Sequence, residues 1–230
     1  MKRIAIVECG PVPEPLVTTH GSYPKIFADL LQPLAGTALS FETVSPIAGD
    51  EVEELRDFDG LLFTGSRYGV YDDLPWMRPL MEEIRAMAAR DRPQVGICFG
   101  HQIVAAALGG EVRKAEVGWG AGVQTYTLEE HHAPSEEVPV FHQDQVVRSP
   151  EGARRLAGNA FCPNGGFAYE APILTYQFHP EFSHRYLADL IDYCEGTRLT
   201  VAEAAAARAS LARHRQPTEI LKRIVVHLSS

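Results

Sequence analysis

The sequence predicts an α/β fold in three layers, with a central, mostly parallel sheet that carries helices on both faces. The first observation is a set of short, almost wholly apolar runs, Arg3–Val7, Gly60–Thr64 and Val95–Ile97, as expected for strands buried on both sides of a parallel sheet. The second is that segments with helical spacing of apolar residues separate these runs, an alternation typical of such sheets. The third is the length of 230 residues, which suits one α/β domain with a helical appendix.

The segment after the first strand, Glu8–Tyr23, is rich in proline and long for a connection between a strand and a helix. That length favours a functional, lid-like role, and a loop that only caps the sheet edge is the alternative. Beyond it we predict a helix with proline in its first turn, a second strand and a short acidic helix, at Pro24–Leu31, Ser40–Val44 and Asp50–Arg56.

The middle of the chain continues this alternation. The strand Gly60–Thr64 runs into Gly65-Ser66, where backbone N–H groups can approach a ligand closely, and a plain turn glycine is the alternative. We predict a helix over 75–90, with a core-facing apolar stripe, and sheet with glycine breaks over 111–128. His131-His132 has acidic neighbours and no second group of ligands, so a polar hairpin tip is a better interpretation than a metal site.

The stretch Gln94–Gly110, QVGICFGHQIVAAALGG, combines a buried strand, an abrupt turn at Cys98 and a helix from about Phe99. Gly96 and Gly100 flank the cysteine in the G-x-nucleophile-x-G pattern of a nucleophile elbow. Glycine leaves room around the strained turn, and the helix N-terminus directs unpaired N–H groups at the sulfur and favours its anion. A buried structural cysteine is the alternative for the motif taken alone.

A base for this nucleophile is predicted after the apolar run Ile173–Phe178, which resembles a strand. In extended chain, alternate residues share a face, so His179 and Glu181 are expected on one side, with Pro180 stiffening the strand exit. A carboxylate can then hold one imidazole nitrogen while the other faces the Cys98 thiol. Taken singly, a core histidine and a solvated glutamate are the alternatives.

Two motifs, GICFGHQ around Cys98 and FHPEF around His179, resemble those of the class I (triad) glutamine amidotransferases. The resemblance covers roughly 1–185 and is greatest to free-standing members similar to the glutaminase domain of GMP synthetase. Plant γ-glutamyl peptidases share the same layout. The resemblance implies the flavodoxin-like fold of these enzymes. Further matching stretches are HGSYPKIF within Val12–Leu31, TGSRYGVYDDLPWM at Thr64–Met77 and FHQDQV at Phe141–Val146.

The resemblance also implies roles for individual residues. Cys98, His179 and Glu181 are expected to be the catalytic nucleophile, base and orienting carboxylate. The backbone amides of Gly65 and Phe99 are expected to form the oxyanion hole. The side chains expected to contact the substrate are Ser66, Gln102, His142, Gln143 and Asp144. For any single member of 142–144, a solvated turn is the alternative.

Two positions depart from the family's pattern. Phe178 stands before His179 where many members have glycine, and it is expected to narrow or reshape the pocket there. Phe141 stands where a small hydroxyl residue is frequent, so the substrate contact usual at that position is not supported. Neither position belongs to the triad.

Three helical segments follow the proposed base, at 184–194, 199–213 and 218–228. The last has one apolar face, which we expect behind Thr218 as the N-cap residue. We therefore divide the chain into a catalytic domain at 1–185 and a C-terminal helical extension at 186–230 that packs on the same domain. A homodimer contact through these helices is the alternative that the sequence leaves open.

Composition argues against several functional classes. A net charge of −9 disfavours nucleic-acid binding, which needs basic patches. No apolar run approaches the roughly 20 residues of a membrane span, and the opening MKRIAIVE passes straight into a strand without a signal peptide. Four cysteines without CxxC spacing indicate neither a zinc site nor a disulfide frame, which fits a reducing cytoplasm. We expect no metal and no cofactor.

The reaction implied by the resemblance is hydrolysis of the glutamine side-chain amide, or of a related γ-glutamyl amide, through a γ-glutamyl thioester, releasing glutamate and ammonia. The sequence has neither a G-x-x-x-x-G-K-[ST] loop nor an SGG-type pyrophosphatase loop, so the ammonia would serve a separate ATP-using synthetase. A stand-alone γ-glutamyl peptide or amide hydrolase is the alternative, favoured by the long proline-rich loop. A third hypothesis is a non-catalytic binding protein on this fold, against which the intact triad argues.

Overall fold

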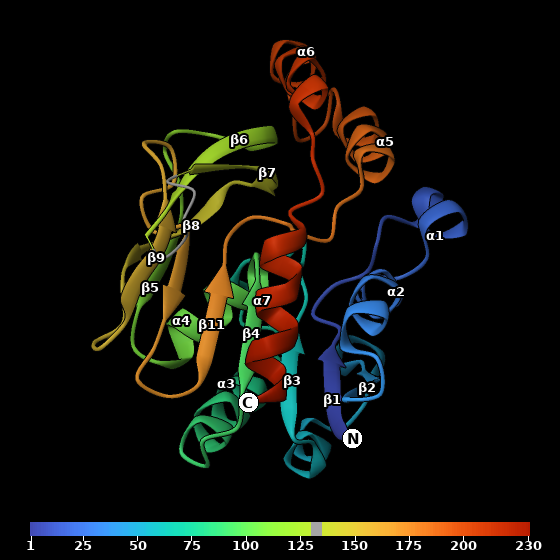
Figure 1. Cartoon of the computed structure of the whole chain (residues 1–230). Helices are drawn as coiled ribbons and strands as arrows, with labels where there is room; N and C mark the ends of the chain where they lie inside the picture. The colour runs from blue at the N-terminus through green and yellow to red at the C-terminus, as the bar shows by residue number, and fades with distance from the viewer. Residues whose placement is uncertain (130–134) are drawn as a thin grey trace.

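The computed structural model describes residues 1–129 and 135–230, and within them a nine-stranded sheet runs through the molecule (Figure 1). In spatial order its strands are β2 (Leu39–Val44), β1 (Lys2–Val7), β3 (Gly60–Phe63), β4 (Gln94–Ile97), β11 (Ile173–Tyr176), β10 (Gly166–Ala168), β9 (Arg154–Gly158), β6 (Gly120–Leu128) and β7 (Ser135–His142). Neighbours from β2 to β11 are parallel, and neighbours from β11 to β7 are antiparallel. A separate antiparallel pair is formed by β5 (Glu111–Lys114) and β8 (Asp144–Arg148).

Helices cover both faces of the parallel part of the sheet, which confirms the predicted three-layer α/β fold (Figure 1). The α-helices are α1 (Glu14–His20), α2 (Tyr23–Ala35), α3 (Met77–Ala88), α4 (Phe99–Ala107), α5 (His184–Cys194), α6 (Val201–Ser210) and α7 (Thr218–Ser229). Short 3₁₀ helices are η1 (Pro46–Ala48), η2 (Val52–Asp57), η3 (Val70–Asp72) and η4 (Leu211–Arg213).

The two faces of β1 show how the layers are held together. Ile4 and Ile6 share a buried cluster with residues of α2 and α7, whereas Ala5 and Val7 share another with residues of α3 and α4. Successive side chains of a strand point to opposite faces, so a fully apolar strand serves two helical layers at once.

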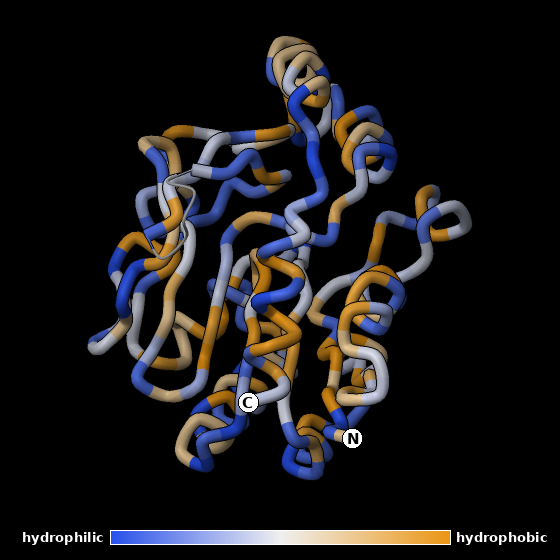
Figure 2. The backbone as a smooth tube through the Cα atoms, viewed as in Figure 1, coloured by the Kyte–Doolittle hydropathy of each residue, from blue (hydrophilic) through white to orange (hydrophobic). Residues whose placement is uncertain are grey.

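The C-terminal helix α7 contributes directly to the first of these clusters. Ile220, Leu221, Ile224 and Leu228 are buried there, and the alternation of hydrophobic and hydrophilic residues along α7 is visible in Figure 2. The predicted apolar face is thus confirmed. The predicted cap is wrong, because Pro217 holds the N-cap position and Thr218 is already helical. The division of the chain at residue 185 stays a prediction.

Several predicted boundaries in the first quarter of the chain need correction. Glu8–Tyr23 is not a bare loop, because it contains α1, which begins with Pro13 at its N-cap. The helix predicted at Pro24–Leu31 runs from Tyr23 to Ala35, between a Ser22 cap and Gly36. The acidic segment predicted as a helix at Asp50–Arg56 is the 3₁₀ helix η2, Val52–Asp57.

The density of polar side chains in FHQDQV predicts a loop at Phe141–Val146, and this prediction is wrong. β7 extends through Phe141 and His142, and β8 begins at Asp144, so Gln143 alone separates two strands. The polar side chains suggested a loop, but the backbone is held by pairing with β6, in which His142 lies opposite Gly120. The chain therefore turns sharply at Gln143 and passes from one sheet to the other. The predicted hairpin tip at His131-His132 lies outside the described residues.

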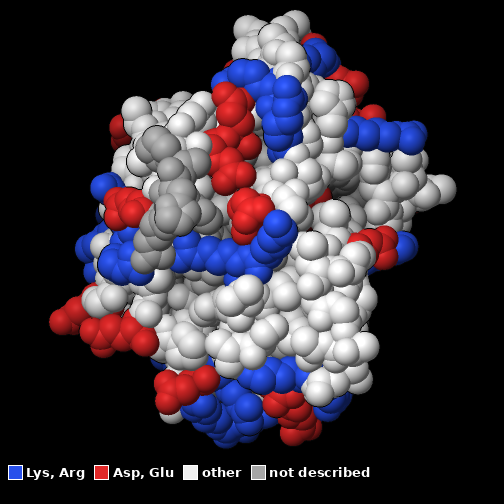
Figure 3. Space-filling view, in the orientation of Figure 1, with Lys and Arg blue, Asp and Glu red and all other residues white. Residues whose placement is uncertain are grey.

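The carboxyl ends of the parallel strands meet at one edge of the sheet, which is where ligands bind in such folds. The segments that leave β1, β3, β4 and β11 converge there, and α5 and α6 stand above them in Figure 1. On the face shown in Figure 3, Lys and Arg are interspersed with Asp and Glu. Within the described ranges, no helix combines the length and apolar character needed to cross a membrane.

Candidate active site

Cys98 lies at the corner between β4 and α4, with φ of 54° and ψ of −103°. A positive φ is strained for a residue with a side chain, and such strain is concentrated at functional positions. A Cβ on Gly96 would lie 2.5 Å from the carbonyl oxygen of Gly100, and a Cβ on Gly100 would lie 2.4 Å from that of Phe63. Only glycine fits at both positions, so the predicted elbow geometry is confirmed.

The surroundings of Cys98 place its sulfur at the N-terminus of α4. The Cys98 backbone N–H donates to the Tyr176 carbonyl over 2.8 Å, which ties the elbow to the end of β11. Cys98 is 5% exposed and lines a cavity, whereas Cys9, Cys162 and Cys194 are buried and do not line it. The sulfur therefore lies beside the free N–H groups in the first turn of α4.

His179 and Glu181 form a buried pair beside the cysteine. His179 Nδ1 lies 2.7 Å from Glu181 Oε1, and both side chains are almost fully buried. Burial alone would lower the pKa of His179, but the Glu181 carboxylate and the Cys98 sulfur outweigh it and raise that pKa to about 10. The imidazole is therefore poised to hold a proton next to the sulfur.

The backbone that brings this pair together is not the predicted strand. β11 ends at Tyr176, and 179–182 form a turn in which the Phe182 N–H donates to the His179 carbonyl over 3.3 Å. The His179 N–H donates to the Pro139 carbonyl over 2.8 Å, which anchors the turn to β7. The two side chains meet across a turn, so the contact was predicted correctly for a wrong structural reason.

Phe182 is a further residue of the site that the sequence reasoning missed. Its ring is stacked on the His179 imidazole, with centroids 3.8 Å apart and planes inclined by 9°. Tyr23 also stacks on Phe182, with centroids 6.2 Å apart, and its hydroxyl accepts that of Tyr186 over 2.9 Å. The motif FHPEF contained Phe182, but a lone aromatic residue after Glu181 gave no sign of stacking.

Gly65 and Phe99, predicted to supply oxyanion-hole amides, both adjoin the reacting side chains. A Cβ on Gly65 would lie 2.9 Å from His179 Cε1 and 3.7 Å from Cys98 Cβ, so the Gly65 backbone lies close to both nucleophile and base. Phe99 follows Cys98 as the first residue of α4, and its ring packs on Trp76. These positions suit amides directed at a carbonyl oxygen held next to the sulfur.

Ser66 lines the cavity directly after Gly65, and its hydroxyl accepts the Tyr68 N–H over 3.1 Å. Gln102 also lines the cavity, one turn along α4. Its Nε2 donates to the Asp144 carbonyl over 3.0 Å and to Gln177 Oε1 over 3.1 Å. In this arrangement the Gln102 amide fixes the strand β8 relative to the elbow.

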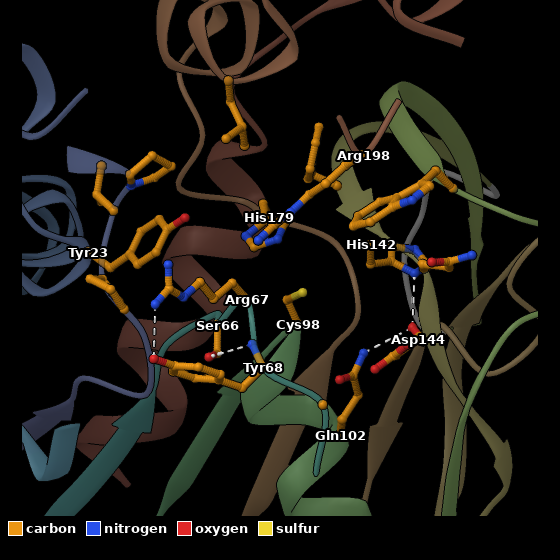
Figure 4. Close-up of a pocket in the computed structure, with 18 of the residues that line it drawn as sticks. Tyr23, Ser66, Arg67, Tyr68, Cys98, Gln102, His142, Asp144, His179 and Arg198 are labelled. Carbon is orange, nitrogen blue, oxygen red and sulfur yellow. Dashed lines mark hydrogen bonds between the residues drawn. The ribbon is translucent and has the colours of Figure 1, made fainter. Parts of the chain in front are cut away.

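The predicted substrate residues at 142–144 also lie along the cavity (Figure 4). His142 Nδ1 donates to the Asp144 carbonyl over 3.1 Å, and its Nε2 is buried without a partner among the described residues. Burial lowers the pKa of His142 to about 3, so the ring is neutral and its Nε2 is a free acceptor. Burial also raises the pKa of the Asp144 carboxyl, which accepts the Tyr71 hydroxyl over 3.0 Å.

The cavity has a volume of about 590 Å³ and brings together most of the predicted site residues. Those that line it are Ser66, Cys98, Gln102, His142, Gln143, Asp144 and His179, while Gly65, Phe99 and Glu181 lie behind its surface. Sequence reasoning missed much of the remaining wall, which includes Arg67, Tyr71, Lys114, Trp119, Tyr193 and Arg198. These residues belong to segments distant in sequence, and no local pattern marks them.

The described ranges contain no group of three His, Cys, Asp or Glu side chains placed to hold a metal ion. The side chains that meet at this site offer a thiol, an imidazole and carboxylates, together with backbone amides. That set can attack a carbonyl carbon, hold the resulting oxyanion and protonate a leaving amine.

Comparisons with known proteins agree with this chemistry. The family model described as glutamine amidotransferase class-I matches residues 29–190. Gamma-glutamyl peptidase 4 of Arabidopsis thaliana is 31% identical over 185 residues, which are 76% of this chain and 73% of that protein. Gamma-glutamyl peptidase 3 of the same plant is 27% identical over 232 residues, 96% of this chain and 93% of that protein. A glutamine-hydrolysing GMP synthase subunit of Sulfolobus acidocaldarius is 34% identical over 153 residues, 64% of this chain and 79% of that protein.

Among solved structures, a glutamine amidotransferase from Thermotoga maritima superposes with a TM-score of 0.75 and 20% identity, covering 99% of this chain and 96% of that one. A glutamine amidotransferase from Methylobacillus flagellatus gives a TM-score of 0.71 and 22% identity, covering 100% of this chain and 93% of that one. These likenesses confirm the predicted fold over the whole chain.

Proposed function

The chain belongs to the class I glutamine amidotransferases, and from this membership we propose that it hydrolyses the side-chain amide of glutamine or of a related γ-glutamyl compound through Cys98. Relatives that are named as glutamine-hydrolysing or γ-glutamyl-cleaving enzymes make the chain an enzyme of the glutamine amidotransferase type. The hypothesis of a non-catalytic binding protein is therefore set aside.

One observation carries the proposal: a strained cysteine and a histidine held by a buried carboxylate border the same cavity. His179 Nδ1 is 2.7 Å from Glu181 Oε1, so this nitrogen carries the proton donated to the carboxylate and Nε2 is left for the thiol. Glu181 thereby fixes the tautomer of His179 and favours its cation, as in other triads.

The reaction follows in two steps. Cys98 loses its proton to His179 and attacks the amide carbon, and the Gly65 and Phe99 amides hold the oxyanion that forms. The carbon–nitrogen bond then breaks, and the leaving ammonia or amine takes the proton from His179. Water, deprotonated by His179, attacks the γ-glutamyl thioester, which releases glutamate and restores the Cys98 thiol.

On the other side of the scissile bond, 142–144 and Ser66 are proposed to hold the amino and carboxylate groups of the γ-glutamyl part. His142 offers a free acceptor at Nε2, and Asp144 offers a carboxylate, both suited to an ammonium group. Gln102 supports this wall through the Asp144 carbonyl.

The experiment that tests this proposal compares wild type with Cys98→Ala on glutamine and on a panel of γ-glutamyl peptides, following ammonia, free amine and glutamate. Cys194→Ala is the matched control, because Cys194 is a buried thiol that does not line the cavity. We expect turnover in wild type and Cys194→Ala and its loss in Cys98→Ala. Equal turnover in all three proteins would contradict the proposal.

Two observations bear on the fate of the nitrogen. The match to the γ-glutamyl peptidases spans up to 93% of their length, and a cavity of about 590 Å³ admits ligands larger than glutamine, which favours a stand-alone hydrolase of γ-glutamyl peptides. The match to glutamine-hydrolysing GMP synthase subunits favours a glutaminase that delivers ammonia to a separate ATP-using synthetase. Ready turnover of γ-glutamyl peptides by the chain alone supports the first, and weak glutamine turnover that rises when such a synthetase is added supports the second.

A further inference from the structure

Three cationic side chains line the cavity although the protein carries a net charge of −9: Arg67, Lys114 and Arg198. Two of them already have neighbours that account for their position. The Arg67 guanidinium lies over the Tyr68 ring and donates to its hydroxyl over 3.2 Å. Lys114 lies on β5 opposite Asp144 of β8. Its positive charge acts to lower the pKa of the Asp144 carboxyl, against the larger effect of burial.

Arg198 differs from these two because none of the described residues forms an ion pair or side-chain hydrogen bond with its guanidinium. Its backbone is nevertheless well fixed in the connection between α5 and α6. The N–H groups of Arg198 and Leu199 both donate to the Cys194 carbonyl over 3.0 Å, and Leu199 is buried. Arg198 is exposed to solvent where it lines the cavity, so its guanidinium is accessible to an anion that enters there.

The position of Arg198 relative to His179 indicates which part of a substrate it meets. Figure 4 shows the Arg198 side chain entering the cavity on the side of His179, whereas Gln102, His142 and Asp144 lie on the other side of Cys98. His179 must reach the leaving nitrogen, so the leaving group extends past His179 and away from 142–144. Phe182, which stacks on His179, also lines the cavity, as do Leu190 and Tyr193 of the helix α5 that precedes Arg198.

We propose that Arg198 binds a carboxylate carried by the leaving group, so that the preferred substrates are γ-glutamyl amides of amino acids or peptides and not glutamine. This inference rests on the proposed hydrolysis at Cys98, and it specifies the chemical class of the leaving group. When the carbon–nitrogen bond breaks, the leaving amine takes the proton of His179, and the released amino acid keeps its carboxylate on Arg198. A planar guanidinium matches a carboxylate with two parallel hydrogen bonds, which a neutral amide cannot accept.

The test uses a matched pair of substrates, γ-glutamylglycine and γ-glutamylglycinamide, which differ only in the charge of the leaving group. For wild type we expect kcat/KM to be about ten times higher for γ-glutamylglycine, the usual effect of one charge-assisted contact at a partly open site. Arg198→Gln is expected to abolish this preference while keeping turnover of γ-glutamylglycinamide. Arg198→Lys, which keeps the charge, is expected to restore part of it.

Arg185→Gln is the control variant, because Arg185 is an exposed arginine of α5 that does not line the cavity, and it should leave the substrate ratio unchanged. Equal kcat/KM for the two substrates in wild type, or a preference that survives in Arg198→Gln, overturns the role of Arg198 and leaves the proposed hydrolysis standing. Absence of hydrolysis of both substrates, and of glutamine, by wild type overturns the proposed function and this inference together.

Discussion

At the scale of single residues, the proposed catalysis depends on how His179 is held. Its Nδ1 contacts Glu181, its backbone N–H donates to Pro139, and its ring is stacked on Phe182. The first two contacts fix the direction of the ring, and the third places an aromatic face against a group that becomes a cation during the reaction. We therefore regard Phe182 as a positioning residue for the base.

Replacing Phe182 with Leu should lower the pKa of His179, because the aromatic face favours the imidazolium and leucine does not. The expected decrease is up to about one pH unit, which corresponds to about 1.4 kcal/mol. It can be measured by NMR titration of the histidine ring and by the pH profile of kcat/KM. Phe178→Leu is the control, since the Phe178 ring contacts the rings of Tyr176 and Tyr126, and the ring stacked on His179 is that of Phe182. An equal pKa in Phe182→Leu and Phe178→Leu would count against the stacking role.

A second histidine, His101, makes a prediction about stability and pH. Its ring is fully buried between Thr175 and the Asn164 carbonyl, and burial lowers its pKa from 6.5 to about 3. As pH falls, His101 takes up a proton in the unfolded chain at a higher pH than in the folded protein. His101 therefore makes the folded state less stable as pH falls from 6.5 towards 3, by up to about 1.4 kcal/mol per pH unit.

The measurement is the free energy of unfolding by urea between about pH 7 and pH 4, for wild type and His101→Gln. We expect the wild-type value to fall more steeply with decreasing pH, so that the two curves converge in acid. Parallel curves over this interval would show that His101 does not titrate as its burial requires.

The chemistry of the central residues could be inferred from the sequence, but their surroundings could not. Cys98 lies in a local pattern whose glycines are needed by the turn itself, so the pattern and the geometry are linked within a few residues. Phe182 and Arg198 act through space, on His179 and on the cavity, and nothing in their immediate sequence reports those contacts. The roles assigned to the oxyanion and substrate residues stay predictions.

At the scale of elements, α7 closes one face of the sheet far from the cavity, and its contribution to stability can be measured. Ile224 is fully buried against the layer formed with α2, whereas Val226 on the same helix is 70% exposed. Ile224→Ala should lower the free energy of unfolding by about 2–5 kcal/mol, because it removes buried carbon atoms and leaves a cavity. Val226→Ala should change that free energy by less than about 0.5 kcal/mol.

Unfolding by urea measures both variants, and turnover per folded molecule should remain near wild type in each. If Ile224→Ala and Val226→Ala were equally stable, α7 would not be the part of the core that its burial indicates.

Helices and strands were predicted correctly where the local sequence pattern was strong. The runs that became β1, β3 and β4 are almost wholly apolar, since both of their faces are covered, and a short run of this kind is easily recognised. The strands within 141–146 were not predicted, because several of their side chains are polar and line the cavity. The strands are defined instead by backbone pairing, of β7 with β6 and of β8 with β5. The turn after β11 was not predicted for a similar reason, because its conformation is fixed by a hydrogen bond to the Pro139 carbonyl of β7.

At the scale of the whole molecule, the cavity is lined by segments from both sheets. The parallel strands of the large sheet supply Cys98 and the segments with Gly65 and His179, its antiparallel strand β7 ends at His142, and Asp144 begins β8 of the separate two-stranded sheet. The helices α5 and α6 share a third buried cluster with residues near the cavity, including Tyr23 and Phe141. Nucleophile, base and substrate wall thus come from widely separated segments, which is why the fold could be predicted more fully than the pocket.

The proposed mechanism requires that Cys98 carries a γ-glutamyl thioester, and this intermediate can be detected directly. Wild type is mixed with a γ-glutamyl substrate that it turns over, quenched in acid and digested, and the peptides are analysed by mass spectrometry. We predict a mass increase of one γ-glutamyl group on the peptide that contains Cys98, and its absence in Cys98→Ala. An adduct on another residue, or continued turnover in Cys98→Ala, would contradict the mechanism.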